Sequence, residues 1–172
     1  MVIKGLMDEC FSDYKKPAMY IATPYCSFKC DKDNGCAVCQ NSKLAHQPNI
    51  EVSVDELIER YLANPITKAI VFSGLEPFDS MDDVELFIKT LRDKYGCDDD
   101  VVIYTGYTID EVSLDDSGRM ENATYNWLRH YENIYVKFGR YLMGQEPHYD
   151  EVLGVKLASD NQYGKKVSYE RV

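Results

Sequence analysis

The sequence predicts an α/β fold built around a parallel β-sheet. Four apolar stretches have the length and composition of buried strands, and stretches with apolar residues at helical spacing lie between them. Strands and helices therefore alternate along the chain, which is the order that a parallel sheet with crossover helices requires. The chain has 172 residues, of which 45% are apolar, so it has the length of a single domain and enough apolar side chains for one core.

The first strand and the first helix are expected in the N-terminal third of the chain. Residues 1–17 are mixed in character and are expected to be irregular or to form a short edge strand, and residues 19–22 have the character of a short buried strand. Ser53 and Glu56 have the spacing of a capping box, in which a hydroxyl and a carboxylate satisfy free amides at a helix start. Apolar residues at helical spacing follow, and the Asn-Pro pair at residues 64–65 is expected to end this helix.

The rest of the chain continues the same alternation. Residues 68–72 are almost continuously apolar, as a strand buried on both faces of a parallel sheet should be. A second capping box at residues 80–83 precedes a helical face that ends near Gly96, and residues 108–111 have the spacing of a third box. The remaining expected elements are strands over residues 101–104, 134–138 and 152–157, a loop over residues 115–118, and a helix over residues 123–131.

Polar and reactive groups follow each of the expected parallel strands. A cysteine-rich loop follows the first strand, the turn at residues 74–77 follows the second, and the turn at residues 105–107 follows the third. Lys137 and the residues after Phe138 lie at the end of the fourth. Ligands of parallel α/β proteins bind at the carboxyl ends of the strands, so the sequence predicts that these segments converge on one site.

The cysteine-rich loop has the composition of a metal site. Cys26, Cys30, Cys36 and Cys39 lie within fourteen residues, and thiolates packed this closely repel one another unless a cation lies between them. Soft sulfur ligands select iron–sulfur clusters, zinc or Cu(I). A structural zinc ion would use all four thiols in a closed tetrahedron. From the spacing alone, an iron–sulfur cluster, a zinc ion and a set of loop thiols without metal all stay open.

The composition argues against some classes of function. The formal net charge of −10 disfavours general nucleic-acid binding, which needs lysine and arginine to neutralise phosphates. No apolar run reaches the roughly 18 residues of a membrane-spanning helix, and residues 1–9 have acids where a signal peptide is apolar. We therefore expect a cytoplasmic protein that binds neither nucleic acid nor membranes. In that compartment clustered cysteines favour a metal or redox role over disulfides.

The cysteine loop resembles the cluster-binding loop of the radical S-adenosylmethionine (SAM) superfamily. Cys26 and Cys30 have the spacing of the first two cysteines in its C-x3-C-x2-C motif, and the third cysteine comes later here. Within the superfamily, the chain is similar to the activating proteins of anaerobic ribonucleotide reductase. In that group an aromatic residue and an asparagine follow the third cysteine, and Cys39-Gln40-Asn41 keeps the asparagine.

Three further segments carry the same resemblance. Residues 74–77 (Gly-Leu-Glu-Pro) are similar to the superfamily's G-G-E-P turn, with Leu75 in place of the second glycine. Residues 103–108 resemble the segment at the end of the third strand in the activating proteins. Residues 159–162 resemble their S-x-N-Q stretch, although the preceding Asp-Gly segment is replaced by residues 137–139.

The resemblance implies a fold, two cofactors and a set of ligands. The fold would be an incomplete parallel (βα)6-type barrel, forming a single radical SAM domain over residues 1–172 with its core at about 18–165. The cofactors would be a [4Fe–4S] cluster and SAM. The cluster ligands would be Cys26, Cys30 and Cys39, with residues 31–35 as an insertion and Cys36 as the alternative third ligand. The implied SAM-binding residues are Phe28, Asn41, Gly74, Leu75, Glu76, Thr105, Tyr107 and Lys137.

The activity implied by the resemblance is that of a glycyl-radical activase. Reductive cleavage of SAM at the cluster would give a 5′-deoxyadenosyl radical, which would abstract hydrogen from a glycine of anaerobic ribonucleotide reductase. The implied partners are the catalytic subunit of that reductase and an electron donor such as flavodoxin, and no catalytic residue beyond the cluster ligands is implied. Two alternatives stay open. One is another radical SAM enzyme with a different protein or small-molecule substrate, and the other is a non-enzymatic zinc-binding interaction module.

Several side chains have two roles open at this point. Glu76 either orients the amino group of SAM or holds its own turn, and Asn41 binds either the loop backbone or the SAM carboxylate. Lys137 either pairs with that carboxylate or is a solvated lysine or a member of a structural ion pair. Cys10 and Cys97 are expected to be free thiols without function.

Overall fold

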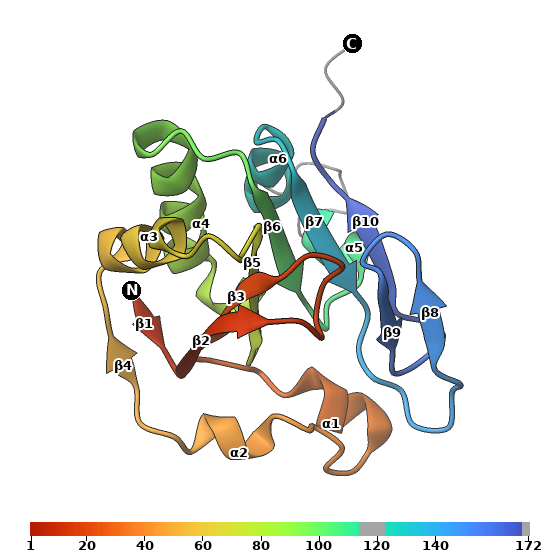
Figure 1. Ribbon diagram of the computed structural model, residues 1–172. Helices are drawn as coiled ribbons and strands as arrows, with labels where there is room; N and C mark the ends of the chain where they lie inside the picture. The colour runs from red at the N-terminus through yellow and green to blue at the C-terminus, as the bar shows by residue number, and fades with distance from the viewer. Residues whose placement is uncertain (114–122, 170–172) are drawn as a thin grey trace.

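The computed structural model describes residues 1–113 and 123–169, and a mostly parallel sheet of six strands lies at its centre (Figure 1). Across the sheet the strand order is β10-β7-β6-β5-β3-β2. Strands β3, β5, β6 and β7 are parallel to one another, whereas β2 and β10 run antiparallel to their neighbours at the two edges. The strands are β2 (Gly5–Cys10), β3 (Ala18–Thr23), β5 (Ala69–Gly74), β6 (Asp100–Tyr104), β7 (Ile134–Phe138) and β10 (Tyr163–Lys166).

The α/β class and the four parallel strands are confirmed, but the expectation that the strands are all parallel is wrong at both edges. Residues 11–17 join β2 to β3, and this connection is too short for the crossover that parallel neighbours need, so the two strands pair antiparallel. The sequence does not predict β10 at all, because Tyr-Gly-Lys-Lys lacks an apolar pattern. Over the residues that the structure describes, β2 and β10 do not pair with each other, and the sheet is open.

One face of the sheet is covered by helices. These are α3 (Val54–Ala63), α4 (Met81–Lys89) and α6 (Ala123–Arg129), which lie on the same side of the strands (Figure 1). Every second residue of the strands points to this face and packs against the helices in one apolar core. Fully buried members of this core are Ile21, Phe72 and Ile103 from the sheet and Ile58, Phe87 and Leu128 from the helices.

One of the three expected capping boxes is complete, at Thr108 and Glu111, and the one at Ser53 and Glu56 is formed in its hydroxyl half only. At the start of α3, the amide of Glu56 donates to Ser53 Oγ (3.0 Å). Before α5 (Ile109–Ser113), the amide of Thr108 donates to Glu111 Oε2 (2.8 Å), and the amide of Glu111 donates to Thr108 Oγ1 (3.3 Å). The expected helix over residues 123–131 is confirmed as α6, whereas the loop expected over residues 115–118 lies outside the described residues.

The region before α4 differs from the expectation. Ser80 makes no side-chain capping hydrogen bond, and the 3-10 helix η1 (Pro77–Ser80) stands where a loop is predicted. Glu76 starts η1, because its Oε1 accepts the amide of Phe78 (3.1 Å). After α4 the chain continues as the π-helix η2 (Thr90–Lys94), and the helical segment ends before Gly96, as the sequence predicts.

The opposite face of the sheet is covered by a smaller apolar cluster. Tyr14, Leu153 and Leu157 pack there against Val71 and Val102. The two leucines belong to a segment with an antiparallel hairpin, β8 (His148–Asp150) and β9 (Val155–Leu157), so the strand expected over residues 152–157 is present only in its second half and outside the main sheet. Since helices α3, α4 and α6 lie on the other face, this side leaves room for a cavity.

Short elements occupy the long connection between β3 and α3. They are the helices α1 (Lys29–Asn34) and α2 (Ser42–Ala45) and the strand β4 (Ile50–Glu51), which pairs with β1 (Val2–Ile3). Both short helices lie at one end of the sheet (Figure 1). Across the described ranges, no helix combines the length and the apolar character that crossing a membrane would require.

Candidate functional site

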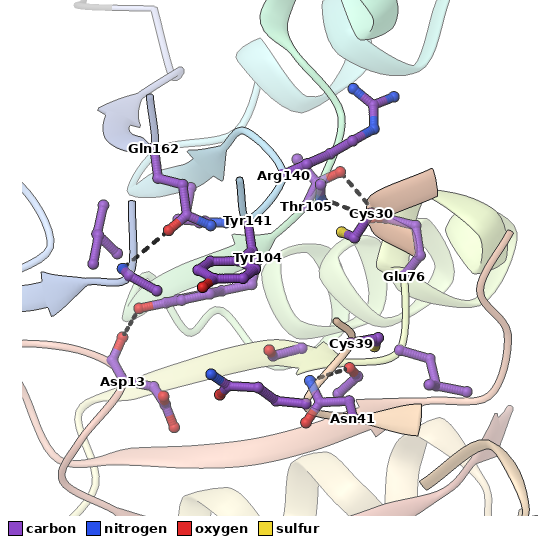
Figure 2. A pocket seen from close by; sticks show the side chains of 18 of the residues that line it. Asp13, Cys30, Cys39, Asn41, Glu76, Tyr104, Thr105, Arg140, Tyr141 and Gln162 are labelled. Atoms are coloured by element: carbon purple, nitrogen blue, oxygen red, sulfur yellow. Dashed lines mark hydrogen bonds between the residues drawn. The ribbon is translucent and has the colours of Figure 1, made fainter. Parts of the chain in front are cut away.

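A cavity of about 560 Å³ lies at the carboxyl ends of the parallel strands. Its volume is in the range of sites that hold small-molecule ligands. Its walls come from the loops after β3, β5, β6 and β7, so the predicted convergence of these segments is confirmed (Figure 2). The predicted site residues that line it are Cys26, Cys30, Cys39, Asn41, Gly74, Leu75, Glu76, Thr105 and Lys137.

The cysteines of the loop fall into two groups. Cys26, Cys30 and Cys39 line the cavity, whereas Cys36 is exposed and lies outside its lining. Burial raises the pKa of Cys26 to about 11, an effect that the hydrogen bond from the Phe28 amide opposes and nearby carboxylates reinforce. Burial also raises the pKa of Cys39, and the Cys30 thiol adds to that rise. Without a cation, the cavity therefore favours the neutral thiols of Cys26 and Cys39, and a bound metal would supply the charge that their thiolates need.

The placement of the sulfur atoms distinguishes between types of metal site. Within the described part of the chain, which includes all six cysteines, no three His, Cys, Asp or Glu side chains are arranged to hold one ion. A structural zinc ion would require four ligands that converge on a single point. The cysteine ligands of a [4Fe–4S] cluster bind different iron atoms, so they surround a volume and do not meet at a point. The described side chains show no such convergence on one point, and Cys26, Cys30 and Cys39 are the thiols of the cysteine loop that line the cavity.

Glu76 is a buried carboxylate that links the loops after β5 and β6. Its Oε1 accepts from Thr105 Oγ1 (2.7 Å), and its Oε2 accepts from the amide of Gly106 (2.8 Å). Thr105 Oγ1 in turn accepts the amide of Tyr107 (3.0 Å). Burial raises the pKa of Glu76, and these hydrogen bonds oppose the rise. Of the two roles open to Glu76 from the sequence, its contacts are those of a residue that holds the turn.

Lys137 places a buried ammonium group in the cavity wall. The residue is 7% exposed, and its Nζ donates to the carbonyl of Gly139 (2.6 Å). Burial lowers the pKa of Lys137 to about 8, although the nearby Cys30 and Glu76 favour the charged form. Arg140, the neighbouring cation, is within 4 Å of two carboxylates, whereas Lys137 makes no such ion pair with any described residue. It is thus neither a solvated lysine nor a member of a structural ion pair.

Asn41 fixes the backbone of the turn at the end of β5. Its Nδ2 donates to the carbonyl of Gly74 (2.7 Å), as Figure 2 shows. This contact joins the loop that carries Cys39 to the turn that carries Glu76. The contact is to backbone, but to that of the turn after β5 and not to that of the cysteine loop, which is the backbone that the sequence interpretation named.

Two predicted residues are not brought into the cavity. Tyr107 is outside the cavity lining; its hydroxyl donates to Asp79 Oδ1 (2.6 Å), and Lys29 Nζ lies 3.9 Å from its ring centre. Phe28 is also outside the lining, and its backbone has a φ of 52°. Phe28 is therefore part of the cysteine loop, and Tyr107 contacts that loop through Lys29, but neither residue lines the cavity.

The cavity also contains residues to which the sequence assigns no function. Cys10 and Asp13 line it from the end of β2, where Cys10 Sγ donates to Asp13 Oδ2 (2.9 Å) and Tyr104 Oη donates to the carbonyl of Asp13 (2.6 Å). Gln162 lines it from the segment before β10 and donates to the carbonyl of Gly139 (3.2 Å). Strand pairing brings these residues to the site, and the resemblance at residues 159–162 is the one sequence signal that points to Gln162.

Comparison with protein families agrees with the geometry of the cavity. A family model described as a 4Fe-4S single cluster domain matches residues 18–140, which is more than half of the chain. The chain therefore belongs to the family of 4Fe-4S single cluster domains. No curated protein matches the chain. The matched range includes Cys26, Cys30 and Cys39 and all four parallel strands, so family membership indicates an iron–sulfur cofactor at this end of the sheet.

Gly74 is a position where a larger residue does not fit. Its φ is 84°, and a Cβ there would lie 2.7 Å from Ala22 Cβ and 2.9 Å from Ala22 Cα. We expect Gly74→Ala to lower the free energy of unfolding by about 3 kcal/mol and the melting temperature by roughly 6–12 °C. Gly35→Ala is the matched control, because Gly35 also has a positive φ (68°) but no atom within 4 Å of its Cβ position. Equal decreases in the melting temperatures of the two variants would contradict the close approach of Ala22 to Gly74.

Glu111 stabilises the cavity end of the molecule in a pH-dependent way. Burial alone would raise its pKa, but Arg140, the amide of Thr108 and Lys29 together lower it from 4.5 to about 2. A lowered carboxyl pKa contributes stability that is complete above pH 4.5 and is lost as the pH falls toward 2. We expect Glu111→Gln to lower the free energy of unfolding near pH 7 by about 1 kcal/mol, since solvent screens this partly exposed group, and by less near pH 3. Urea unfolding at both pH values measures the difference, and losses that do not depend on pH would contradict it.

Proposed function

We propose that this protein is a radical SAM enzyme that acts as the glycyl-radical activase of anaerobic ribonucleotide reductase. The observation that carries the proposal is that three thiols of the cysteine loop share one cavity, at the ends of parallel strands, with a buried ammonium group that forms no ion pair with any described residue. Membership of an iron–sulfur cluster family supports the cluster. The resemblance of residues 26–41 and 74–77 to the motifs of the activating proteins supports SAM and the activity.

In this proposal Cys26, Cys30 and Cys39 hold a [4Fe–4S] cluster and leave one iron open to SAM. When bound, the reduced cluster would supply the electron for cleavage of the sulfonium–C5′ bond of SAM, which is the chemistry by which hydrogen would be taken from a glycine of the partner. The cysteine loop excludes water from one side of this site. The turn at residues 74–77, which Asn41 holds in place, offers its backbone carbonyls to the amino group of SAM.

Lys137 binds the carboxylate of SAM in this arrangement. A charge-assisted hydrogen bond to a carboxylate would give the buried ammonium the anionic partner that it does not have among the described residues. Glu76 does not bind SAM in this proposal. It supports the site by joining the turn after β5 to Thr105 and Gly106 after β6 through hydrogen bonds.

The fold and the surroundings suit the proposed chemistry. A mostly parallel sheet with helices on one face has the layout of a section of an α/β barrel, which is the fold that the resemblance implies. The partners in this proposal are the reductase catalytic subunit, which supplies the glycine, and an electron donor such as flavodoxin. We place the protein in the cytoplasm, where thiols remain reduced.

The test is a radical-transfer assay under anaerobic conditions. Reconstituted, reduced protein is mixed with SAM and the reductase catalytic subunit from the same organism. We expect a glycyl radical signal by electron paramagnetic resonance and about one 5′-deoxyadenosine per radical formed, as the transfer of one hydrogen atom requires. 5′-Deoxyadenosine without a glycyl radical would identify a radical SAM enzyme with another substrate. Absence of both products would contradict the proposal.

A further inference from the structure

Between Cys30 and Cys39, hydrogen bonds from the backbone to one side chain hold the cysteine loop in a closed conformation. Asp31 lies next to Cys30 in α1, and its Oδ1 accepts the amides of Val38 (2.8 Å) and Cys39 (2.9 Å). A single carboxylate oxygen therefore joins the start of α1 to the backbone at Cys39. Hydrogen bonds from amides to a carboxylate are stronger than those between neutral groups, so the contact holds this part of the loop closed.

A second contact fixes the same helix to the rest of the molecule. Asn34 Nδ2 donates to the carbonyls of Cys30 (2.8 Å) and Tyr141 (2.9 Å), and Asn34 Oδ1 accepts the amide of Met143 (2.8 Å). Arg140 Nε lies 3.2 Å from Asp33 Oδ2. These contacts attach α1 to the connection between β7 and β8, beside which it lies in Figure 1. The loop therefore closes against a fixed support.

In this closed conformation of the loop, the two candidates for the third cluster ligand, Cys36 and Cys39, lie in different environments. After α1 the chain turns at Gly35, which has a φ of 68°, and Cys36 follows in an exposed position. Val38 and Cys39 are then held by Asp31, and both line the cavity. The Cys39 thiol shares the cavity with Cys26 and Cys30, while that of Cys36 does not.

We propose that Asp31 selects the third cluster ligand: by holding the backbone at Val38 and Cys39, it keeps Cys39 in the cavity and Cys36 outside it. This inference rests on the proposed cluster site. Asp31 is a positioning residue, because it acts through the backbone of Cys39 and does not touch the cluster. The proposal explains how an insertion between the second and third cysteines leaves one defined ligand although a further thiol is nearby.

The first part of the experiment needs no cluster. Full-length protein treated with a chelator is alkylated with iodoacetamide, and the rate at each cysteine is followed by peptide mass spectrometry. We expect Asp31→Ala to raise the rate at Cys39 about tenfold, because two charge-assisted hydrogen bonds no longer oppose opening of the loop. The rate at the exposed Cys36 should not change. Asp31→Asn keeps an oxygen acceptor without the charge, so its rate should lie between those of Asp31→Ala and the native protein. Lys32→Ala, an exposed neighbour in α1, is the matched control.

The second part measures ligand choice after reconstitution with iron and sulfide. Cys39→Ser alone should lower cluster iron about tenfold, because serine is a poor ligand for this soft site. Adding Asp31→Ala to Cys39→Ser should recover about half of the native iron, because the freed loop lets Cys36 reach the cavity. Circular dichroism verifies that each variant folds.

The outcomes separate the two proposals. A native rate of alkylation at Cys39 in folded Asp31→Ala would overturn the role of Asp31, whatever the metal content. A double variant as poor in iron as Cys39→Ser would overturn the selection of the ligand. If native protein takes up no iron while Asp31→Ala still exposes Cys39, the cluster proposal fails and only the closure of the loop stands.

Discussion

Replacing Cys26, Cys30 or Cys39 with serine is expected to remove the [4Fe–4S] cluster, whereas Cys36→Ser is expected to keep it. The first three thiols line the cavity, and the fourth is exposed outside it. Serine is a hard oxygen ligand that does not replace a thiolate at an iron–sulfur cluster. We expect iron and acid-labile sulfide per chain to fall about tenfold in each of the three cavity variants, since the remaining thiols hold the cluster poorly.

Cys36→Ser is the matched control, because it makes the same change of atom in the same loop. All four variants are compared after anaerobic reconstitution by metal and sulfide analysis, with thermal melts to verify folding. Loss of the cluster in Cys36→Ser but not in Cys39→Ser would show that Cys36, and not Cys39, is the third ligand, and it would contradict our assignment. Equal loss of one tightly bound zinc ion in all four variants would instead support a closed zinc site.

Lys137→Met is expected to weaken SAM binding strongly without loss of folding stability. A charge-assisted hydrogen bond contributes roughly 1.5–3 kcal/mol, so removal of the ammonium should raise the dissociation constant of SAM about 10- to 100-fold. The same ammonium destabilises the free protein, because burial lowers its pKa to about 8 from 10.5. Methionine fills a similar volume without a charge, so the variant should be more stable than the native protein by about 2 kcal/mol near pH 7.

The pH dependence of folding stability distinguishes the effect of the buried Lys137 charge from an effect of packing alone. Between pH 8 and 10.5 the folded native protein loses the Lys137 proton while the unfolded chain keeps it, so native stability gains with rising pH. The advantage of Lys137→Met should therefore shrink over that range. Isothermal titration with SAM and urea unfolding measure the two effects, with Lys43→Met, an exposed lysine outside the cavity lining, as the control. Native SAM affinity in Lys137→Met would contradict the assigned role.

The sequence predicts the parallel strands and most helix starts because their signals are local. Residues 68–72 are continuously apolar, and Ser53 with Glu56 makes the expected hydrogen bond at a helix start. The edge strands have no such signal. β10 is polar, and it is a strand because β7 offers a free edge with which it pairs. Ser80 does not cap α4, because Glu76 takes the first free amide one turn earlier.

The difference between local and long-range signals also explains which residues of the candidate site can be predicted from the sequence. Residues at the end of a strand or just after it, such as Lys137 and Glu76, can be found from the sequence, because the carboxyl ends of parallel strands share one edge. Asp13 cannot be found in this way, since it reaches the cavity through the antiparallel pairing of β2 with β3. Phe28 and Tyr107 are near the site in sequence, but the direction of a loop side chain depends on its packing, and the Tyr107 hydroxyl donates to Asp79 outside the cavity lining.

The most direct test of the cluster and its open iron is electron paramagnetic resonance of the anaerobically reconstituted, reduced protein with and without SAM. We predict a [4Fe–4S]⁺ signal whose g values change when SAM is added, because SAM would bind the iron that Cys26, Cys30 and Cys39 leave open. A cluster signal that SAM does not alter would contradict the open iron and the radical SAM function. A protein with no such signal and one tightly bound zinc ion would contradict the cluster itself.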